Sequence, residues 1–529
     1  MCGILLFNSS GSCDVTAQDV YLEFAEDDKV VTSSGKDTID KIVPYIVARG
    51  PNFSSYRTLH GVNTCWFSSV LSLRQPFTKQ SIVIDKKFVL QFNGELYNKT
   101  IDLDENDTQY IVQLLSNIDV YDDDKLSIQQ EIINVIKNLD GEFAYTISDL
   151  VNNIIYFGRD TIGKRSLSYC IDSQTNELYV ASVTGTTSKQ FINCIGGQIY
   201  IFDTSKRDFI VEPCNIRDVP YDVTSLVDEG LNDLNMITSE LYEQLSNAVS
   251  KRITTIHPTH IENSPIAILF SGGLDCSIIV ALMCEQLIKM PGNNTIIELL
   301  NVGFENPRTK LQPSDTPDRK LAISSTKILK NLYPDVNIKL IEVDVPYEEY
   351  LSIRPKVIDY MYPKNTEMDL SIAIAFFFAS RGQGFITNYD DGTRHEYNRK
   401  GIVLFSGLGA DELYGGYHKF ANKSTPELVE ELVKQINNIH DRNLNRDDKV
   451  IAENGVEVRY PFLDESVIQY STSKIPINYK INKFILRNVA KIKLNLGAIA
   501  EEPKRAIQFG SKSAKMTKDG NKNGTDILK

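Results

Sequence analysis

The fold of this 529-residue chain is indicated most clearly by the stretch Ile268-Leu269-Phe270-Ser271-Gly272-Gly273-Leu274-Asp275-Cys276-Ser277. The apolar run at residues 266–270 is typical of a strand that is buried on both faces of a parallel sheet. Two glycines then form a tight turn, and residues 277–290 have the pattern of a helix. The backbone N–H groups of such a turn, together with the helix N-terminus, form a site that binds anions.

Three side chains in this stretch suggest which anion binds there. Ser271 and Ser277 add hydroxyl donors to the turn. Asp275 would repel a bare phosphate, so its presence fits a Mg²⁺ ion that bridges the carboxylate to the anion. The alternative is an ordinary helix start, because aspartate and serine are both good capping residues. The spacing alone leaves both interpretations open.

A doubly wound parallel sheet is predicted around this stretch, in a domain of residues 236–510. Further strands are expected at 296–303, 338–343 and 402–405, with helices between them. Strands that alternate with helices at this spacing are typical of α/β domains. Residues 307–320 and 388–400 are polar and predict mobile loops. The last stretch, 511–529, predicts a frayed polar tail.

The first 210 residues have a different pattern, in which short β-rich runs dominate. Strands are predicted at 4–7, 81–84, 88–92, 143–148, 154–157, 178–181 and 198–202, with turns at Asn93-Gly94 and Gly196-Gly197. Helices are predicted at 107–116 and 127–139. These elements predict layered antiparallel sheets with helices outside, an α+β domain. Acidic residues 211–235 predict a linker to the second domain.

Composition excludes several classes of protein. Hydrophobic residues make up 42% and charged residues 24%, which is typical of globular chains and not of disordered or fibrous ones. The net charge of −13 argues against a general nucleic-acid binder. No apolar run reaches the roughly 20 residues of a membrane span. The start of the chain lacks the features of a secretory signal, so a cytoplasmic location is expected. The cysteines form no Cys-x-x-Cys pair, which leaves Cys2 without a zinc or disulfide role.

Several motifs resemble the glutamine-hydrolysing asparagine synthetase family. In the first half they are Met1-Cys2-Gly3-Ile4, Arg49-Gly50-Pro51, Asn93-Gly94-Glu95-Leu96-Tyr97-Asn98 and Gly158-Arg159-Asp160. In the second half, the 271–277 loop precedes Phe405-Ser406-Gly407-Leu408-Gly409-Ala410-Asp411-Glu412-Leu413-Tyr414-Gly415-Gly416-Tyr417 and Gly455-Val456-Glu457-Val458-Arg459-Tyr460-Pro461-Phe462-Leu463-Asp464. Lys504-Arg505-Ala506-Ile507-Gln508-Phe509-Gly510 is closer to the divergent asparagine synthetase domain-containing subfamily.

For the first half, the resemblance implies an N-terminal-nucleophile (Ntn) glutamine amidotransferase. Removal of Met1 would give Cys2 a free α-amine that can act as its own base. Its thiolate would attack the side-chain amide of glutamine and release ammonia. Asn93 and the Gly94 N–H would form the oxyanion hole, although Asn93-Gly94 alone is also typical of a hairpin turn.

The resemblance also suggests how glutamine is held. Glu95 and Asp107 would bind its α-ammonium group, although Asp107 alone could equally cap the helix that it begins. The family has an arginine for the α-carboxylate where this chain has Val70. Arg74 is near enough in sequence to substitute. If it does, Arg74→Ala should raise the KM for glutamine sharply.

For the second half, the resemblance implies an ATP pyrophosphatase domain that adenylates a carboxylate. The residues expected to contact ATP are Phe270, Ser271, Gly272, Gly273, Asp275, Ser277, Val302, Ser406 and Gly407. Asp275 and Asp411 would hold Mg²⁺, and Lys483 would be a catalytic residue that stabilises charge on the phosphates. Leu408 stands where the family has a glutamate, and leucine can neither accept a proton nor pair with a cation.

The leading hypothesis is therefore a glutamine- and ATP-dependent amidotransferase of the asparagine synthetase type, with aspartate as the acceptor. Val70 and Leu408 favour two alternatives. One is an amidotransferase with another carboxylate acceptor, and the other is a degenerate scaffold that binds glutamine or ATP without catalysis. No nucleic-acid or membrane partner is expected. The sequence leaves the oligomeric state open, a homodimer included.

Overall fold

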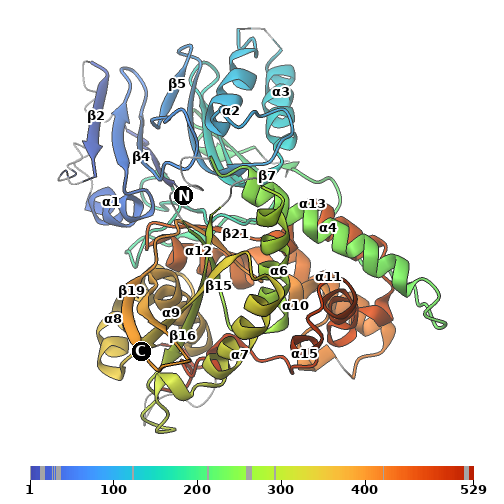
Figure 1. Cartoon of the computed structure of the whole chain (residues 1–529). Helices are drawn as coiled ribbons and strands as arrows, with labels where there is room; N and C mark the ends of the chain where they lie inside the picture. The colour runs from blue at the N-terminus through green and yellow to red at the C-terminus, as the bar shows by residue number, and fades with distance from the viewer. Residues whose placement is uncertain are drawn as a thin grey trace. The chain divides into compact units, whose positions relative to one another are not determined.

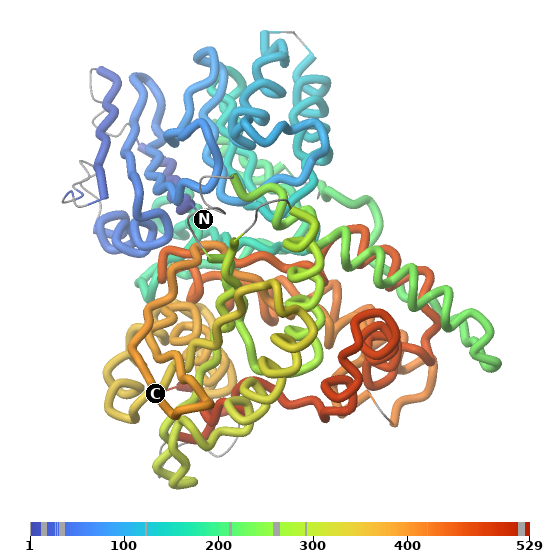
Figure 2. The backbone as a smooth tube through the Cα atoms, in the orientation of Figure 1, coloured from blue at the N-terminus to red at the C-terminus, as the bar shows by residue number. Residues whose placement is uncertain are grey.

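The computed structural model describes residues 2–11, 18–26, 28, 30, 37–121, 124–210, 214–257, 265–290, 294–420, 422–516 and 524–528. The chain divides into two compact units, drawn as a cartoon in Figure 1 and as a backbone tube in Figure 2. The first unit contains Met1–Val219 and two later segments, Asp359–Pro363 and Ile439–Gly455. The second contains Pro220–Ile358, Lys364–Asn438 and Val456–Lys529.

Two antiparallel sheets form the centre of the first unit. The first sheet has the spatial order β11 (Ile192–Asn193), β9 (Ser168–Ile171), β10 (Leu178–Ala181), β1 (Gly3–Asn8), β4 (Thr64–Val70), β3 (Phe53–Thr58) and β2 (Val20–Ala25). The second has the order β13 (Asp208–Phe209), β12 (Gln198–Asp203), β8 (Ile154–Arg159), β7 (Gly141–Asp149), β6 (Phe88–Leu96) and β5 (Ile82–Ile84), with β14 (Cys214–Asn215) also paired to β12. Ile4 and Leu6 of β1 share a buried core with Phe157 of β8, so the sheets pack face to face.

Helices cover the outer faces of both sheets. Helices α2 (Asp107–Ser116) and α3 (Lys125–Lys137) lie beside the second sheet (Figure 1). Ile111 of α2 and Ile132 of α3 share a core with Phe88 and other residues of β6. On the first sheet, Ile46 of α1 (Asp37–Arg49) lies 2.6 Å from the place of a Cβ at Gly3. The layers are therefore helix, sheet, sheet and helix, which confirms the predicted layered antiparallel architecture. The inserted segment 439–455 adds α12 (Asn445–Ala452) to this unit.

A mostly parallel sheet forms the centre of the second unit. Its spatial order is β19 (Arg394–Asn398), β18 (Gln383–Thr387), β17 (Asn337–Val345), β16 (Ile296–Phe304), β15 (Ile266–Leu269), β20 (Val403–Phe405) and β21 (Glu457–Arg459). The five strands from β17 to β21 are parallel, and β18 and β19 pair antiparallel at one edge. The parallel order confirms the predicted class. The strand order reverses between β15 and β20, and such a switch point is where α/β sheets bind ligands.

Helices α6 (Leu274–Ile288), α7 (Pro317–Leu332) and α9 (Glu367–Arg381) pack against this sheet. The unit also contains α4 (Leu234–Thr254), α10 (Ala410–Leu413), α11 (Thr425–Asn437), α13 (Glu465–Ser473), α14 (Phe484–Asn488), α15 (Gly497–Ala500) and α16 (Ile507–Gly510), with most of α8 (Tyr347–Tyr360). Among the described helices, none is long and apolar enough to cross a bilayer.

The predicted turn at Asn93-Gly94 is wrong. Both residues lie within β6, where Gly94 pairs with Phe143 of β7. A Cβ at Gly94 would overlap the carbonyl oxygen of Glu142, so the glycine is needed for close strand packing and not for a turn. Gly197, by contrast, lies in a turn with φ of +79°, as predicted.

The predictions for three polar stretches are also corrected. Residues 307–320 contain the start of α7, because Pro317 is the first residue of that helix, where proline is tolerated. Residues 388–400 contain β19, which pairs with β18. The first residues of the predicted tail are packed into the second unit, because Ser511, Ser513 and Met516 are buried. The Ser513 hydroxyl donates to the carbonyl oxygen of Ser371 at 2.6 Å, which gives this polar segment a fixed partner.

Candidate functional site

Cys2 lies directly before β1 and is partly exposed. Its backbone N–H donates to Oδ1 of Asn93 at 2.9 Å, and Nε of Arg49 donates to its carbonyl oxygen at 3.2 Å. Asn93 belongs to β6 and Arg49 ends α1, so two separate elements position this residue. Its thiol forms no disulfide with any cysteine in the described ranges. The structure therefore brings the predicted nucleophile and Asn93 together.

The amide nitrogen of Asn93 is an unused donor. Asn93 is fully buried, and its Nδ2 has no hydrogen-bond partner in the described part of the chain. Leaving a buried donor unpaired costs free energy, which a bound acceptor would restore. Since Oδ1 of the same amide accepts from Cys2, the donor lies close to the nucleophile, as an oxyanion hole requires.

Strand geometry directs the Gly94 N–H toward the open edge of β6. The Phe92 N–H donates to Oε1 of Gln80, and the Leu96 N–H donates to Oδ2 of Asp107. The N–H groups of residues two apart in a strand point the same way, so the Gly94 N–H lies between these two on that edge. The geometry is therefore compatible with both predicted oxyanion-hole donors.

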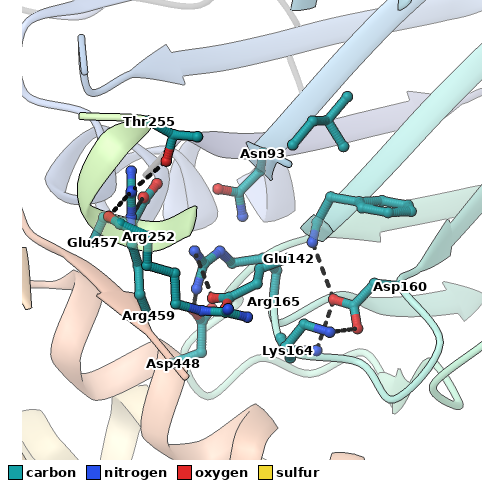
Figure 3. Close-up of polar contacts among 12 residues, drawn as sticks. Asn93, Glu142, Asp160, Lys164, Arg165, Arg252, Thr255, Asp448, Glu457 and Arg459 are labelled. Atoms are coloured by element: carbon teal, nitrogen blue, oxygen red, sulfur yellow. Dashed lines mark hydrogen bonds and ion pairs between the residues drawn. The ribbon is translucent and has the colours of Figure 1, made fainter. Parts of the chain in front are cut away.

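A buried charged network fixes Arg49 behind Cys2, and Asp448 is at its centre. Asp448 accepts from Nη2 of Arg49 at 2.9 Å and from the Ser166 hydroxyl at 2.7 Å, and lies 3.9 Å from Nη1 of Arg165. Arg165 also lies 3.4 Å from Glu142 (Figure 3). Burial opposes the charged form of Asp448, but attraction by Arg49 and Arg165 prevails and holds the pKa of this carboxyl below its usual value.

The sequence analysis missed Asp448. It belongs to α12 and is 399 residues from Arg49, so no local pattern connects them. The run Arg446-Asp447-Asp448-Lys449 is fully charged, which normally indicates a solvated helix face, yet all four residues are buried. Burial also lowers the pKa of Lys449 to about 7.

Arg74, Glu95 and Asp107 form a second buried cluster in this unit. Nε and Nη2 of Arg74 lie 2.7 and 2.5 Å from Oε1 of Glu95, and Nε lies 3.9 Å from Oδ2 of Asp107. Nη2 also donates to the Leu96 carbonyl oxygen at 2.7 Å, and Nη1 to that of Glu105 at 3.4 Å. The structure thus pairs Arg74 with the two carboxylates that were expected to hold the substrate ammonium group.

In the second unit, the 271–277 stretch forms the predicted turn. Gly272 has φ of +80°, and a Cβ there would lie 2.5 Å from the backbone nitrogen of Ala322 in α7. Gly273 is the N-cap of α6, and no side chain caps that helix end. The capping alternative for Asp275 and Ser277 is therefore wrong. Ser277 instead donates to the carbonyl oxygen of Gly272 at 3.4 Å, within the turn.

The carboxyl ends of three neighbouring strands converge beside this turn. Asn301 near the end of β16 donates to the carbonyl oxygen of Phe270, which follows β15. Val302 is buried one residue further along β16. After β20, a Cβ at Gly407 would lie 3.1 Å from Cβ of Asp275. The predicted nucleotide-lining residues Phe270, Val302 and Gly407 therefore lie around one switch point.

Lys483 contacts one aspartate in the 271–277 stretch and another in α10. Its Nζ lies 2.5 Å from Oδ2 of Asp275 and 2.5 Å from Oδ1 of Asp411. Lys483 itself is buried and has φ of +60°, and a Cβ at Gly416 would overlap both Asp411 and the lysine. The three predicted charged residues of the ATP site are thus brought into direct contact.

Lys504 was not predicted to belong to this site. Its Nζ forms an ion pair with Oδ2 of Asp411 and lies 4.8 Å from the centre of the Tyr417 ring. Burial lowers the pKa of Lys504 to about 8, against the attraction of Asp275. The subfamily motif at 504–510 was the available signal, although its partner lies 93 residues away.

The two aspartates fit a Mg²⁺ ion that is shared with a phosphate ligand. Oδ1 of Asp275 is buried and has no hydrogen-bond partner in the described ranges. No group of three or more His, Cys, Asp or Glu residues suited to a metal occurs in those ranges. Mg²⁺ commonly uses one or two carboxylates and takes its other ligands from phosphates and water. Asp275 and Asp411 suit such a site.

Leu408 stands where the family resemblance predicts a glutamate. Its N–H donates to the Ser406 hydroxyl at 3.3 Å, and the Ser406 N–H donates to the carbonyl oxygen of Arg459 at 3.0 Å. These contacts hold the Ser406-Gly407-Leu408 turn to β21. Leu408 brings no polar side-chain atom to the loop. The nearby Glu412 is buried and accepts from the hydroxyl of Tyr417 at 2.5 Å.

Comparison with known proteins finds two domains. Residues 69–187 match a glutamine amidotransferase domain, and residues 240–430 and 421–527 match asparagine synthase. An asparagine synthetase domain-containing protein of Saccharomyces cerevisiae is 60% identical and covers 100% of this chain and 99% of its own length. The human asparagine synthetase domain-containing protein 1 is 27% identical over 91% of this chain and 93% of its own. The human glutamine-hydrolyzing asparagine synthetase is 26% identical over 89% of this chain and 81% of its own.

Proposed function

The chain belongs to the asparagine synthetase family, in its divergent domain-containing subfamily, and from this premise we propose that both units are catalytic. The two domains support a glutamine-dependent amidotransferase. We propose that Cys2 releases ammonia from glutamine, that ATP adenylates a carboxylate, and that ammonia displaces AMP to give an amide. Aspartate is the proposed acceptor, and the cytosol is the proposed location.

In the first unit, the proposed chemistry depends on Cys2 and Asn93. After removal of Met1, the α-amine of Cys2 would accept the thiol proton, and Asn93 Oδ1 lies 2.9 Å from that nitrogen. The thiolate attacks the amide carbon and ammonia leaves, giving a thioester that water hydrolyses. The Nδ2 of Asn93 and the N–H of Gly94 would stabilise the negative oxygen.

In the second unit, the contact of Lys483 with both Asp275 and Asp411 is the observation that carries the proposal. This contact holds a buried cation beside the two carboxylates that are proposed to bind Mg²⁺, which is where charge on the phosphates would have to be neutralised. The carboxylate of the acceptor attacks the α-phosphorus of ATP and pyrophosphate leaves. Lys483 neutralises charge on the phosphates in that step. Asp275 and Asp411 would hold Mg²⁺, which supplies further charge neutralisation when bound.

Leu408 keeps a second candidate open, namely an amidotransferase with a different carboxylate acceptor. The leucine leaves the Ser406-Gly407-Leu408 loop without the acid that the family resemblance led us to expect. A less polar acceptor would suit such a loop. The third candidate, a non-catalytic scaffold that binds glutamine or ATP, predicts that no acceptor supports chemistry at all.

Exchange of labelled pyrophosphate into ATP distinguishes these candidates in the full chain. Aspartate-dependent exchange supports the leading proposal, and exchange with other carboxylates only supports the second. Lys483→Ala should reduce exchange by about a hundredfold or more, because the charge that it neutralises develops in the transition state. Lys491→Ala is the matched control, since that lysine is exposed and pairs with Glu501. Absence of exchange with every carboxylate tested would leave only the scaffold.

A further inference from the structure

Two lysines pair with the carboxylate of Asp411, and the structure holds them to different degrees. Nζ of Lys483 lies 2.5 Å from Oδ1 of Asp411, and Nζ of Lys504 forms an ion pair with Oδ2. The Lys483 side chain is 3% exposed, and the Lys483 N–H donates to the carbonyl oxygen of Tyr414 at 2.9 Å. A Cβ at Gly416 would overlap the lysine, so the side chain is also enclosed from that side. Lys483 therefore has a fixed position.

Lys504 is held less firmly. It lies between α15 and α16, where residues 501–506 form no helix or strand. The N–H groups of Lys504 and Arg505 donate no backbone hydrogen bond within the described ranges, and the Lys504 side chain is 18% exposed. Lysine carries its charge on a flexible four-carbon stem, so it can change partners while the backbone stays in place. Of the two lysines, Lys504 is therefore the one that can leave Asp411.

The charges around the two aspartates give Lys504 a reason to leave. In the described part of the chain, the ion pairs of Asp275 and Asp411 are with Lys483 and Lys504, so two carboxylates meet two ammonium groups. A divalent cation bound to both aspartates, as proposed for MgATP, would add two positive charges beside these lysines. Like charges at such short range repel each other. Because Lys483 is fixed, this repulsion acts to displace Lys504.

The proposed reaction contains an anion that can receive Lys504. The acceptor carboxylate has to approach the α-phosphorus of ATP beside the two aspartates, where the phosphates repel it. A cation between the two anions reduces this repulsion. Leu408 supplies no charge, and Lys483 is assigned to the phosphates, so Lys504 is the remaining cation of the cluster. Its Nζ lies 4.8 Å from the centre of the Tyr417 ring, a contact that keeps the ammonium group near the site when Asp411 is released.

We infer that Lys504 switches between two anions, pairing with Asp411 before MgATP binds and with the carboxylate to be adenylated afterwards. The inference rests on the proposed function, which assigns ATP and an acceptor carboxylate to this site. Lys504 forms no covalent bond in this role and transfers no proton. It binds the acceptor, and it also opposes the binding of a bare divalent cation to the two aspartates before the nucleotide arrives.

Binding of Mn²⁺ alone to the full chain tests the first half of this switch. Free Mn²⁺ is measured by electron paramagnetic resonance for the unaltered chain, Lys504→Met and Lys504→Arg. The methionine variant lacks the competing charge and should bind Mn²⁺ about fivefold tighter or more, within the usual range for two sites that oppose each other. The arginine variant keeps the charge and should match the unaltered chain. Lys491→Met, which removes an exposed pair with Glu501, is the matched control and should also match it.

Exchange of labelled pyrophosphate into ATP tests the second half of the switch. The acceptor that is titrated is aspartate, or the carboxylate that supports exchange in the unaltered chain. Lys504→Met should raise the acceptor concentration for half-maximal exchange about tenfold, the worth of one charged hydrogen bond. The KM for ATP should change much less, because Lys483 and the 271–277 turn remain. Lys504→Arg should recover most of the acceptor affinity.

The two measurements separate the switch from a structural role. A lysine that only supported the fold would, when replaced, weaken metal and acceptor binding together, whereas the switch predicts tighter metal and weaker acceptor binding. Equal Mn²⁺ affinity of the unaltered chain and Lys504→Met would overturn the inference. An unchanged acceptor requirement in Lys504→Met would overturn it as well. If no carboxylate supports exchange in the unaltered chain, the proposed function fails, and the acceptor role of Lys504 fails with it.

Discussion

Asn93 illustrates how one residue links structure to chemistry. Its Oδ1 accepts from Cys2, while its buried Nδ2 has no partner in the described ranges. Asn93→Ala removes both functions, so ammonia release should fall by about a hundredfold to a thousandfold in kcat, as for other oxyanion-hole donors. Asn63→Ala, at an exposed position, should leave the rate unchanged. Full activity of the Asn93 variant would exclude this asparagine from the oxyanion hole.

Burial of Lys480 lowers its pKa, and this makes the free energy of unfolding depend on pH. Lys480 is 1% exposed, and burial lowers its pKa from 10.5 to about 7. Between about pH 7 and 10.5 the unfolded chain binds more protons, so stability rises with pH there, by up to about 1.4 kcal/mol per unit. Lys480→Met should remove the contribution of Lys480 to this slope and stabilise the second unit at pH 7, as followed by urea unfolding at several pH values; the lowered pKa of Lys504 leaves a smaller slope above about pH 8. Lys474→Met, an exposed control, should keep the slope.

At the scale of elements, the strand, turn and helix around Gly272 are the best-predicted part of the fold. Burial on both faces, a double glycine and a helical run are all local signals. Strands β3 and β4 were missed because they contain buried serines, among them Ser54, Ser55, Ser68 and Ser69, which hide the usual apolar alternation. Their partners lie across the sheet, so only the assembled fold explains their burial.

Some site residues could be predicted from local motifs, and others could not because their partners are distant in the sequence. Cys2, Asn93, Asp275 and Lys483 belong to motifs that a family resemblance can identify, and the structure places them in contact as two groups. The pairing of Arg74 with Glu95 could not be predicted, because the sequence shows that an arginine is near but not which carboxylates surround it. The pairing of Lys504 with Asp411 could not be predicted either, because the sequence does not show which carboxylate the lysine contacts.

Gly272 packs the proposed phosphate-binding loop against α7, and its substitution tests the importance of this close packing. Gly272→Ala adds a Cβ that would lie 2.5 Å from the Ala322 nitrogen, in a backbone conformation with φ of +80°. Gly392→Ala is the matched control, since its φ is +75° and nothing lies within 4 Å of the added Cβ. Both variants carry the strain of about 1 kcal/mol for positive φ. Only Gly272→Ala should also weaken MgATP binding, and equal affinities would contradict the proposed loop.

At the scale of the whole molecule, the first unit depends on Asp448 from late in the chain. Asp448→Asn would leave Arg49 and Arg165 without their shared counter-ion, and a broken buried pair costs about 3–5 kcal/mol. We expect the first unit to unfold at lower urea and ammonia release to fall. Asp218→Asn removes only an exposed pair with Lys137 and should leave the urea midpoint almost unchanged, because water screens such pairs. Equal effects of the two variants would remove Asp448 from this role.

Because segment Ile439–Gly455 belongs to the first unit, that unit can be completed only late in translation. The ribosome synthesises residues 1–219 long before residues 439–455. The ion pair between Arg49 and Asp448 therefore cannot form until most of the second unit has been synthesised. The first unit therefore cannot complete the contacts behind Cys2 until residues 439–455 have been translated. A message cut short in its second half would yield an incomplete first unit. The connectivity thus makes the proposed release of ammonia at Cys2 depend on translation of the chain to residue 448 or beyond.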